Sequence, residues 1–251
     1  ATLQISDARV YAHTPKSYKN YLLHVPFLLR CLALVLVILV LARPQTTNKW
    51  QNSEIEGIDI MLAIDVSTSM LAEDLKPNRL EAAKDVAAEF INGRPNDNIG
   101  ITLFAGETFT QCPLTVDHAV LLDMIHNIKC GLITDGTAVG MGIANAVTRL
   151  KDSKAKSKVI ILLTDGTNNK GDISPMTAAE IAKSFGIRVY TIGVGTNGMA
   201  PYPYPVGNTV QYVSMPVEID EKTLTEIAGT TDGNYFRATS NSKLKEVYEE
   251  I

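Results

Sequence analysis

An apolar run that ends in a carboxylate is the most informative short stretch of the sequence. Residues 60–70 read IMLAIDVSTSM, so Asp65 follows a hydrophobic segment, and Ser67 and Ser69 follow it at alternate positions. Alternate residues of an extended chain point to the same side, so these three side chains can face one ligand. A buried strand has no need of such a polar group at its end. We therefore expect something polar to bind there.

Two further oxygen-bearing residues lie downstream in a similar setting. Thr137 stands in TDGTAVG at the start of a predicted helix, and Asp165 follows the apolar run KVIILLT. The set contains two carboxylates and three hydroxyls, without sulfur or imidazole, which suits a hard cation and is poor for zinc. We predict Mg²⁺, with Mn²⁺ or Ca²⁺ as alternatives. The predicted metal ligands are Asp65, Ser67, Ser69, Thr137 and Asp165.

The hydrophobic pattern predicts the elements that must position these residues. Continuous apolar runs alternate with amphipathic helical segments, and the runs occupy residues 58–64, 99–105, 158–164 and 187–194. Strands that are apolar throughout, separated by helices, are typical of a parallel sheet covered on both faces. The predicted fold class is therefore α/β, a doubly wound, mostly parallel sheet of the Rossmann-like kind. In such folds ligands bind at the carboxyl ends of the strands, where Asp65 and Asp165 would lie.

The first part of the chain has a different character. Residues 26–42 are apolar except for Arg30, and as a helix they would be about 25 Å long, near the lower limit for crossing a bilayer. A buried helix of a soluble protein is the alternative. The predicted organisation is an N-terminal juxtamembrane segment, a transmembrane helix, a linker and an α/β domain with a C-terminal extension, over residues 1–21, 22–43, 44–56 and 57–251.

Charge and cysteine content limit the choice of partners. The net charge is −4 with Lys and Arg scattered along the chain, which does not fit a nucleic-acid-binding protein. Basic residues before the apolar segment favour a cytoplasmic N-terminus and a large domain on the periplasmic side, with membrane lipid around the helix. The three cysteines show no metal-binding spacing, and the sequence leaves open whether Cys112 and Cys130 pair.

The motifs together resemble a known family. DVSTS, the downstream DGT and LLTDG resemble the metal-ion-dependent adhesion site of von Willebrand factor A domains. The resemblance implies direct metal contacts from Ser67, Ser69 and Thr137, and direct or water-mediated contacts from Asp65 and Asp165. It also implies an open coordination position that an acidic residue of a partner fills, so that the site binds without catalysis. Asp135, beside the threonine, would orient these ligands, as residues around a metal site often do.

The resemblance extends over nearly the whole chain. With LARPQ after the apolar segment and IRVYTIGVGTNG near the end of the domain, the sequence is similar to the bacterial aerotolerance (Bat-type) membrane proteins, in particular the BatA-like branch. This implies a place in the cytoplasmic (inner) membrane of a bacterium and a stress or oxygen-tolerance complex. The implied partners are other aerotolerance-type membrane proteins and a MoxR-type AAA+ ATPase. A periplasmic domain would leave such an ATPase only residues 1–20 to contact.

Several alternatives remain open at this level. Each predicted ligand could instead cap a helix or turn, and the protein could be a structural membrane scaffold with a vestigial metal site. A phosphoryl-transfer hydrolase would use Asp65 as nucleophile, but Ser67 stands where such enzymes carry a second aspartate.

A second motif, GVGTNG at residues 193–198, matches a dinucleotide fingerprint only superficially. A dinucleotide site needs a helix after the glycines, and the proline-rich MAPYPYPVGNT follows instead. We expect a protruding loop or hairpin there. The tyrosines of PYPYP, residues 201–205, could form a rim for a protein partner.

Overall fold

The N-terminal unit contains one described helix. The computed structural model separates into two compact units, Ala1–Asn52 and Ser53–Ile251. In the first unit, α2 (Val25–Ala42) covers most of the predicted apolar segment. Within the described part of the chain, no helix meets the length and hydrophobicity needed to cross a membrane. The transmembrane helix over 22–43 therefore stays a prediction. The described residues are 18, 22, 24–42, 57–165, 167–206, 209–217 and 219–239.

A six-stranded sheet forms the centre of the second unit, in the order β3-β2-β1-β4-β5-β8. All neighbouring strands run parallel except β3, which pairs antiparallel with β2 at one edge. This confirms the predicted α/β fold with a mostly parallel sheet. The strands are β1 (Asp59–Asp65), β2 (Asn98–Phe104), β3 (Thr108–Thr115), β4 (Lys158–Thr164), β5 (Ile187–Val194) and β8 (Tyr235–Ala238).

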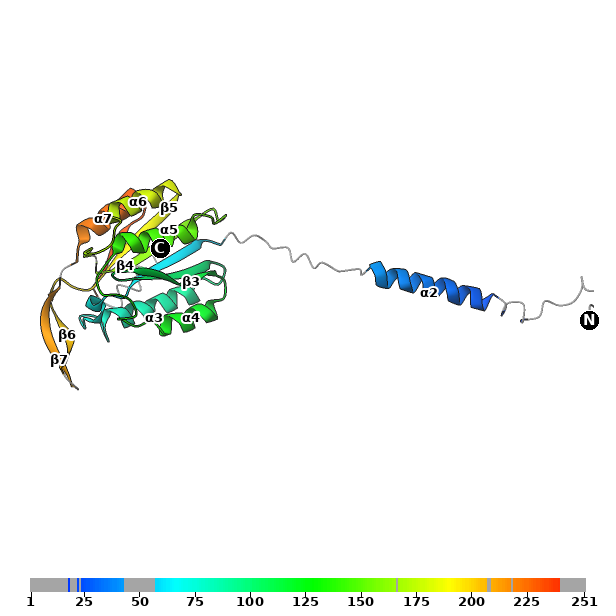
Figure 1. The fold of residues 1–251 in the computed structure, drawn as a ribbon, viewed down its shortest axis with the longest axis horizontal. Coiled ribbons are helices and arrows are strands. Elements are labelled where there is room, and N and C mark those ends of the chain that lie inside the picture. Colours follow the sequence, from blue (N-terminus) through cyan, green and yellow to red (C-terminus); the bar gives the residue numbers. More distant parts are fainter. Residues whose placement is uncertain are drawn as a thin grey trace, which may run out of the picture. The chain divides into compact units, whose positions relative to one another are not determined.

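Helices cover both faces of this sheet (Figure 1). On one face lie α3 and α4, and on the other lie α5, α6 and α7. Side-chain caps fix several helix starts: the Asn78 side chain, for example, accepts a hydrogen bond from the Glu81 amide before α3. The helices are the short 3-10 helix η2 (Thr68–Leu71), α3 (Arg79–Asn92), α4 (His118–His126), α5 (Val139–Leu150), α6 (Pro175–Ser184) and α7 (Glu221–Thr230).

The uninterrupted apolar run of β1 reflects burial on both sides of the sheet. Ile60, Leu62 and Ile64 pack into the core beneath α3 and α4. Met61 and Ala63 belong to the opposite core, beneath α5 and α6. Since successive strand residues point to opposite faces, a strand covered on both sides must be apolar at every position. Polar chemistry can then appear only where the strand ends.

The strand order creates a crevice beside the end of β1. This strand lies between β2 and β4. The helix after β1, which is α3, covers one face of the sheet, and the helix after β4, which is α6, covers the other. In doubly wound folds, ligands bind at such a reversal of strand order.

Beyond the main sheet, β6 (Gly198–Val206) and β7 (Thr209–Val217) form a separate antiparallel ribbon. The expectation of a protruding loop or hairpin after GVGTNG is thus confirmed as a hairpin. Cys112 and Cys130 are free thiols.

Candidate metal centre

The turn after β1 is held by hydrogen bonds to a buried carboxylate. Asp65 is fully buried. Its Oδ1 accepts a hydrogen bond of 2.9 Å from the Ser67 amide, and its Oδ2 accepts one of 2.6 Å from the hydroxyl of Thr164 on β4. The hydroxyls of Ser67 and Ser69 lie 2.9 Å apart. The two serines therefore face the same side of the turn, but the predicted reason was wrong: Ser69 lies in the 3-10 helix η2, whose turn, and not an extended chain, brings the hydroxyls together.

Residues from three connections meet in one hollow beside this turn. The hollow has a volume of about 180 Å³ and contains three of the predicted ligands, Ser69, Thr137 and Asp165. Asp65 and Ser67 join the group through the hydrogen bonds from the Ser67 amide to Asp65 and between the two serine hydroxyls. The sheet thus brings together five side chains that are up to 100 positions apart in the sequence. Also lining the hollow are Arg79, Thr167, Asn169, Pro216 and Val217.

Asp135 connects the turn after β1 to the segment before α5. Its carboxylate accepts hydrogen bonds from the amide and the hydroxyl of Thr68, at 3.1 and 3.0 Å. Lys170 donates to the Asp135 carbonyl at 2.6 Å. The same segment approaches Gly106 so closely that an added Cβ there would lie 2.8 Å from the carbonyl oxygens of Thr134 and Asp135. Asp135 therefore holds Thr68, which lies between Ser67 and Ser69, and the orientation of the metal ligands by Asp135 stays a prediction.

Two asparagines after β4 hold the start of α5, and the sequence reasoning did not identify them. Asn169 accepts a hydrogen bond from the Thr137 amide, and Asn168 accepts one from the Val139 amide, each at 2.9 Å. They satisfy backbone donors that a helix start leaves without intrahelical partners. The run TDGTNN was the available signal, because asparagines next to a strand-end aspartate can cap a neighbouring segment.

Arg79 is a third site residue that the sequence reasoning did not identify. Its side chain is only 1% exposed and forms an ion pair with each of two carboxylates, Asp74 at 2.7 Å and Asp165 at 3.3 Å. Gly195, with φ of +123°, packs on the guanidinium, and a Cβ there would lie 2.5 Å from it. The sequence did not indicate that Arg79 is buried, because it stands at the first position of a helix and helix starts are normally solvated.

The electrostatics of the hollow favour a cation. Burial, and then the charge of Asp165, raise the pKa of Asp65 to about 7, although hydrogen bonds from Ser67 and Thr164 oppose this shift. Burial also raises the pKa of Asp165, partly offset by Ser69 and Arg79. Two buried carboxylates facing hydroxyl groups are stabilised by a proton or a metal ion. Among the described residues, no cluster of three or more His, Cys, Asp or Glu side chains offers an alternative metal site.

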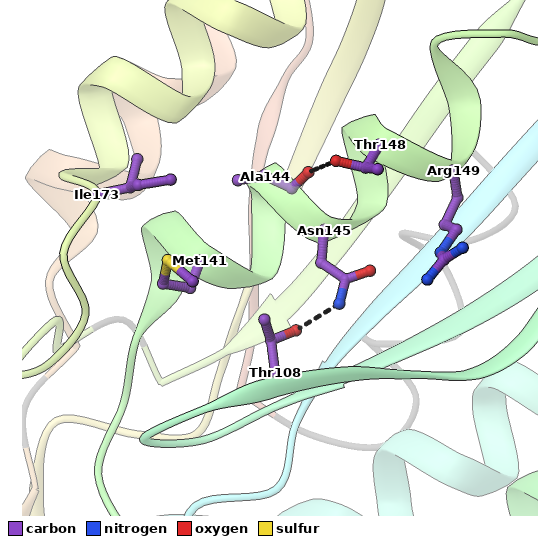
Figure 2. A pocket seen from close by; sticks show the side chains of 7 residues that line it. All are labelled: Thr108, Met141, Ala144, Asn145, Thr148, Arg149 and Ile173. Carbon is purple, nitrogen blue, oxygen red and sulfur yellow. Dashed lines mark hydrogen bonds between the residues drawn. The ribbon is translucent and has the colours of Figure 1, made fainter.

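A second hollow, of about 350 Å³, lies along α5 beside β3 (Figure 2). Its polar side chains bond to one another or to the backbone: Asn145 donates to Thr108, and Thr148 donates to the Ala144 carbonyl. Arg149 donates to Thr110. None of the described residues that line this hollow carries a carboxylate. It therefore lacks the donor set of a cation site.

The fold and the first hollow, lined by Ser69, Thr137 and Asp165, define a doubly wound α/β domain with candidate metal ligands at the carboxyl ends of its strands. The sequence profile of the von Willebrand factor type A domain matches residues 59–250. The chain therefore belongs to that family.

Several relatives are known by sequence. An uncharacterized protein of Borreliella burgdorferi is 30% identical over 207 residues, which are 82% of this chain and 61% of that protein. A UPF0353 protein of Nocardia farcinica is 30% identical over 267 residues, which are 99% of this chain and 77% of that protein.

Solved structures connect the chain to aerotolerance proteins. An aerotolerance-related membrane protein of Bacteroides fragilis is 33% identical with a TM-score of 0.70, covering 78% of this chain and 96% of that one. BatB of Bacteroides thetaiotaomicron is also 33% identical, with a TM-score of 0.69 and coverage of 77% and 97%. A mussel byssus matrix protein, described with zinc in its metal-ion-dependent adhesion site, shares the fold at 24% identity and a TM-score of 0.60, over 77% and 44% of the two chains.

Proposed function

We propose that the hollow binds a divalent cation, Mg²⁺ in the first instance, through Asp65, Ser67, Ser69, Thr137 and Asp165. The observation that carries this proposal is the convergence of these oxygens around a fully buried aspartate whose pKa is raised to about 7. A cation relieves the repulsion between the two buried carboxylates, and oxygen ligands suit Mg²⁺, Mn²⁺ or Ca²⁺.

We further propose that the cation serves to bind a protein partner. Five ligands leave one position of an octahedral Mg²⁺ open, and because three of them are neutral hydroxyls the ion stays electrophilic enough to accept a further carboxylate. An Asp or Glu from a partner would complete the coordination. No catalytic role is proposed, because Ser67 occupies the place at which a phosphoryl-transfer enzyme of this pattern needs an acidic side chain. A zinc-bound adhesion site in the byssus protein lends support to the metal proposal through the shared fold.

The cation proposal can be tested by thermal unfolding with Mg²⁺, Mn²⁺ or EDTA. A ligand that binds only the folded state raises its stability, so the wild-type midpoint should rise with metal. Ser67→Ala should lose most of this rise. Ser184→Ala is the matched control, because the one partner of the Ser184 hydroxyl among the described residues is the Ile181 carbonyl of its own helix. Equal metal effects in both variants, or none in the wild type, would show that the cluster is vestigial.

The partner proposal needs a separate experiment on membranes. Proteins captured by the wild-type chain in Mg²⁺ should be lost in EDTA and lost with Asp65→Ala. We expect them to include other aerotolerance-type membrane proteins and a MoxR-type AAA+ ATPase. Capture that is insensitive to both changes would favour a structural scaffold over metal-bridged recognition.

We also propose that residues 22–43 anchor the chain in the cytoplasmic membrane with the domain on the periplasmic side. Support comes from the relatives named as membrane proteins and from the exposed apolar side chains of α2, such as Phe27, Leu34 and Val40. Protease protection in inverted and right-side-out vesicles tests the orientation. Cleavage of the domain from the cytoplasmic side would reverse it and permit direct ATPase contact with the metal face.

A further inference from the structure

The β6–β7 ribbon exposes several large apolar side chains. It projects from the body of the domain (Figure 1). Met199, Tyr204 and Tyr212 are 64, 56 and 61% exposed, and Val213 and Met215 are 46 and 44% exposed. A two-stranded ribbon alone is marginally stable in water, and exposed apolar clusters commonly mark interaction surfaces. The ribbon therefore has the character of a surface that a partner covers.

One edge of the ribbon is closed to further strands. Pro201 and Pro203 on β6 have no amide hydrogen to donate. The Pro201 carbonyl accepts a hydrogen bond of 2.9 Å from the Glu73 amide, so this backbone group points away from β7. Alternate strand residues direct their backbone groups to the same side, and Pro203 therefore points outward as well. Prolines on an edge are a known device against strand pairing.

The opposite edge is open. The ribbon register pairs Pro201 with Ser214 and Pro203 with Tyr212. In an antiparallel pair, the partner of an outward-facing residue also faces outward, so the amides and carbonyls of Tyr212 and Ser214 point away from β6. Among the described residues, no backbone hydrogen bond reaches either group. Residues 211–216 are all exposed. Pro216 belongs to the same outward row but has no amide hydrogen, so this edge presents the amides of Tyr212 and Ser214 and three carbonyls to an added strand.

The base of β7 reaches the candidate metal centre. Pro216 and Val217 line the same hollow as Ser69, Thr137 and Asp165. From Ser214 to Val217 a strand advances about 10 Å. A segment paired with the open edge would thus have its end at the mouth of the hollow, within reach of a bound cation. The edge and the metal centre form a continuous surface.

We propose that the open edge of β7 receives an extended segment of a partner protein as a third strand of the ribbon. Its side chains lie beside Tyr212, Val213 and Met215 of β7, and an Asp or Glu at its end enters the metal centre. Backbone pairing supplies affinity and the acidic residue supplies register, as in other cases of strand addition. The acidic contact rests on the proposed cation site, whereas the strand pairing does not.

The test measures binding of labelled peptides to the full chain by fluorescence anisotropy. The probes are seven-residue peptides of alternating Val and Thr with blocked ends and an Asp at the first or the last position, so that either strand direction is covered. Matched probes carry Asn in place of Asp, or N-methyl groups on alternate amides. We expect the better Asp peptide to bind in Mg²⁺ and to weaken in EDTA, the Asn peptides to ignore the metal, and the N-methyl peptides not to bind.

The protein side of the test uses one position and two substitutions. Ser214→Pro removes an outward amide and leaves the hydrogen bonds to β6 intact, whereas Ser214→Ala keeps the amide. Ser214→Pro should weaken peptide binding about tenfold, the equivalent of one backbone hydrogen bond, and Ser214→Ala by less than about twofold. Equal binding to both variants, or binding of the N-methyl peptides, would overturn strand addition. Loss with Ser214→Pro but no metal effect would support the pairing and overturn the acidic contact.

Discussion

Replacement of Arg79 by Met offers the sharpest test of the charge arrangement at the metal centre. The guanidinium donates to both oxygens of Asp74, at 2.8 and 2.7 Å, and to Asp165 at 3.3 Å. Met fills a similar volume without charge. Asp74 retains hydrogen bonds from the amides of Leu75 and Thr196, so it is only partly orphaned. Asp165 loses its only ion pair among the described residues.

The expected loss follows from these contacts. Removing one partner of a buried ion pair typically costs about 3–5 kcal/mol, and the retained bonds to Asp74 place Arg79→Met near the lower end of that range in EDTA. In saturating Mg²⁺ the cation balances the charge of Asp165, so the loss should be smaller by about 1 kcal/mol or more. Coupling is reciprocal, and the variant should therefore bind Mg²⁺ about fivefold more tightly than the wild type.

Urea denaturation in EDTA and in Mg²⁺ measures both quantities. Arg94→Met is the matched control, because the Arg94 side chain is 25% exposed, pairs with Asp97 at 3.4 Å and lies over the Phe90 ring. Its loss should stay below about 1 kcal/mol and be independent of metal. Equal losses for Arg79→Met in EDTA and Mg²⁺ would refute the view that the guanidinium and a cation share the charge of Asp165. A loss below about 1 kcal/mol in EDTA would refute a structural role for the ion pairs.

Two further predictions concern the surroundings of Arg79. Gly195→Ala should destabilise the domain by about 1–3 kcal/mol in thermal or urea unfolding, because a Cβ would lie 2.5 Å from the guanidinium. Gly198→Ala has a similar positive φ but open space around the Cβ, so a loss as large in that control would assign the effect to backbone strain alone. Burial by itself would raise the pKa of Asp74, but hydrogen bonds from Arg79 and Thr196 outweigh it and hold this pKa below the usual value of an aspartate. The stability from this shift is present above about pH 4 and is lost as the pH falls through the lowered pKa. In urea unfolding from pH 7 to pH 3, Asp74→Asn should therefore lose less stability at acid pH than the wild type. An equal loss in both proteins would contradict the lowered pKa of Asp74.

Much of the fold and of the candidate site could be predicted because the relevant signals are local. The apolar run of β1 is continuous because the strand is buried on both faces, and this pattern is visible in any strand of that kind. Ser67 and Ser69 follow Asp65 within one turn, so their common direction needs no long-range information. Asp165 could be added because parallel strands bring their carboxyl ends to one edge of the sheet, and Thr137 because it stands at the start of a predicted helix in the DGT motif.

Other features depended on contacts between distant parts of the chain. Arg79 is buried because Asp74 and Asp165 converge on it, and the second of these lies 86 positions away. Asn168 and Asn169 act on the start of α5, which precedes them in the sequence by about 30 positions. The neighbouring sequence does not indicate these pairings, because an arginine or an asparagine would be equally acceptable at these positions if it were exposed to solvent.

The sequence by itself determined the alternation of strands and helices and the residue types at the strand ends. These follow from hydrophobic periodicity and from the chemistry of oxygen ligands. Only the tertiary structure decided which edge of the β6–β7 ribbon is open. Prolines in PYPYP indicated a hairpin or loop, but the bond from Glu73 to Pro201 and the register with β7 fixed the direction of every backbone group. The direction of the backbone groups depends on how the two strands pair, and it therefore cannot be inferred from the sequence of either strand alone.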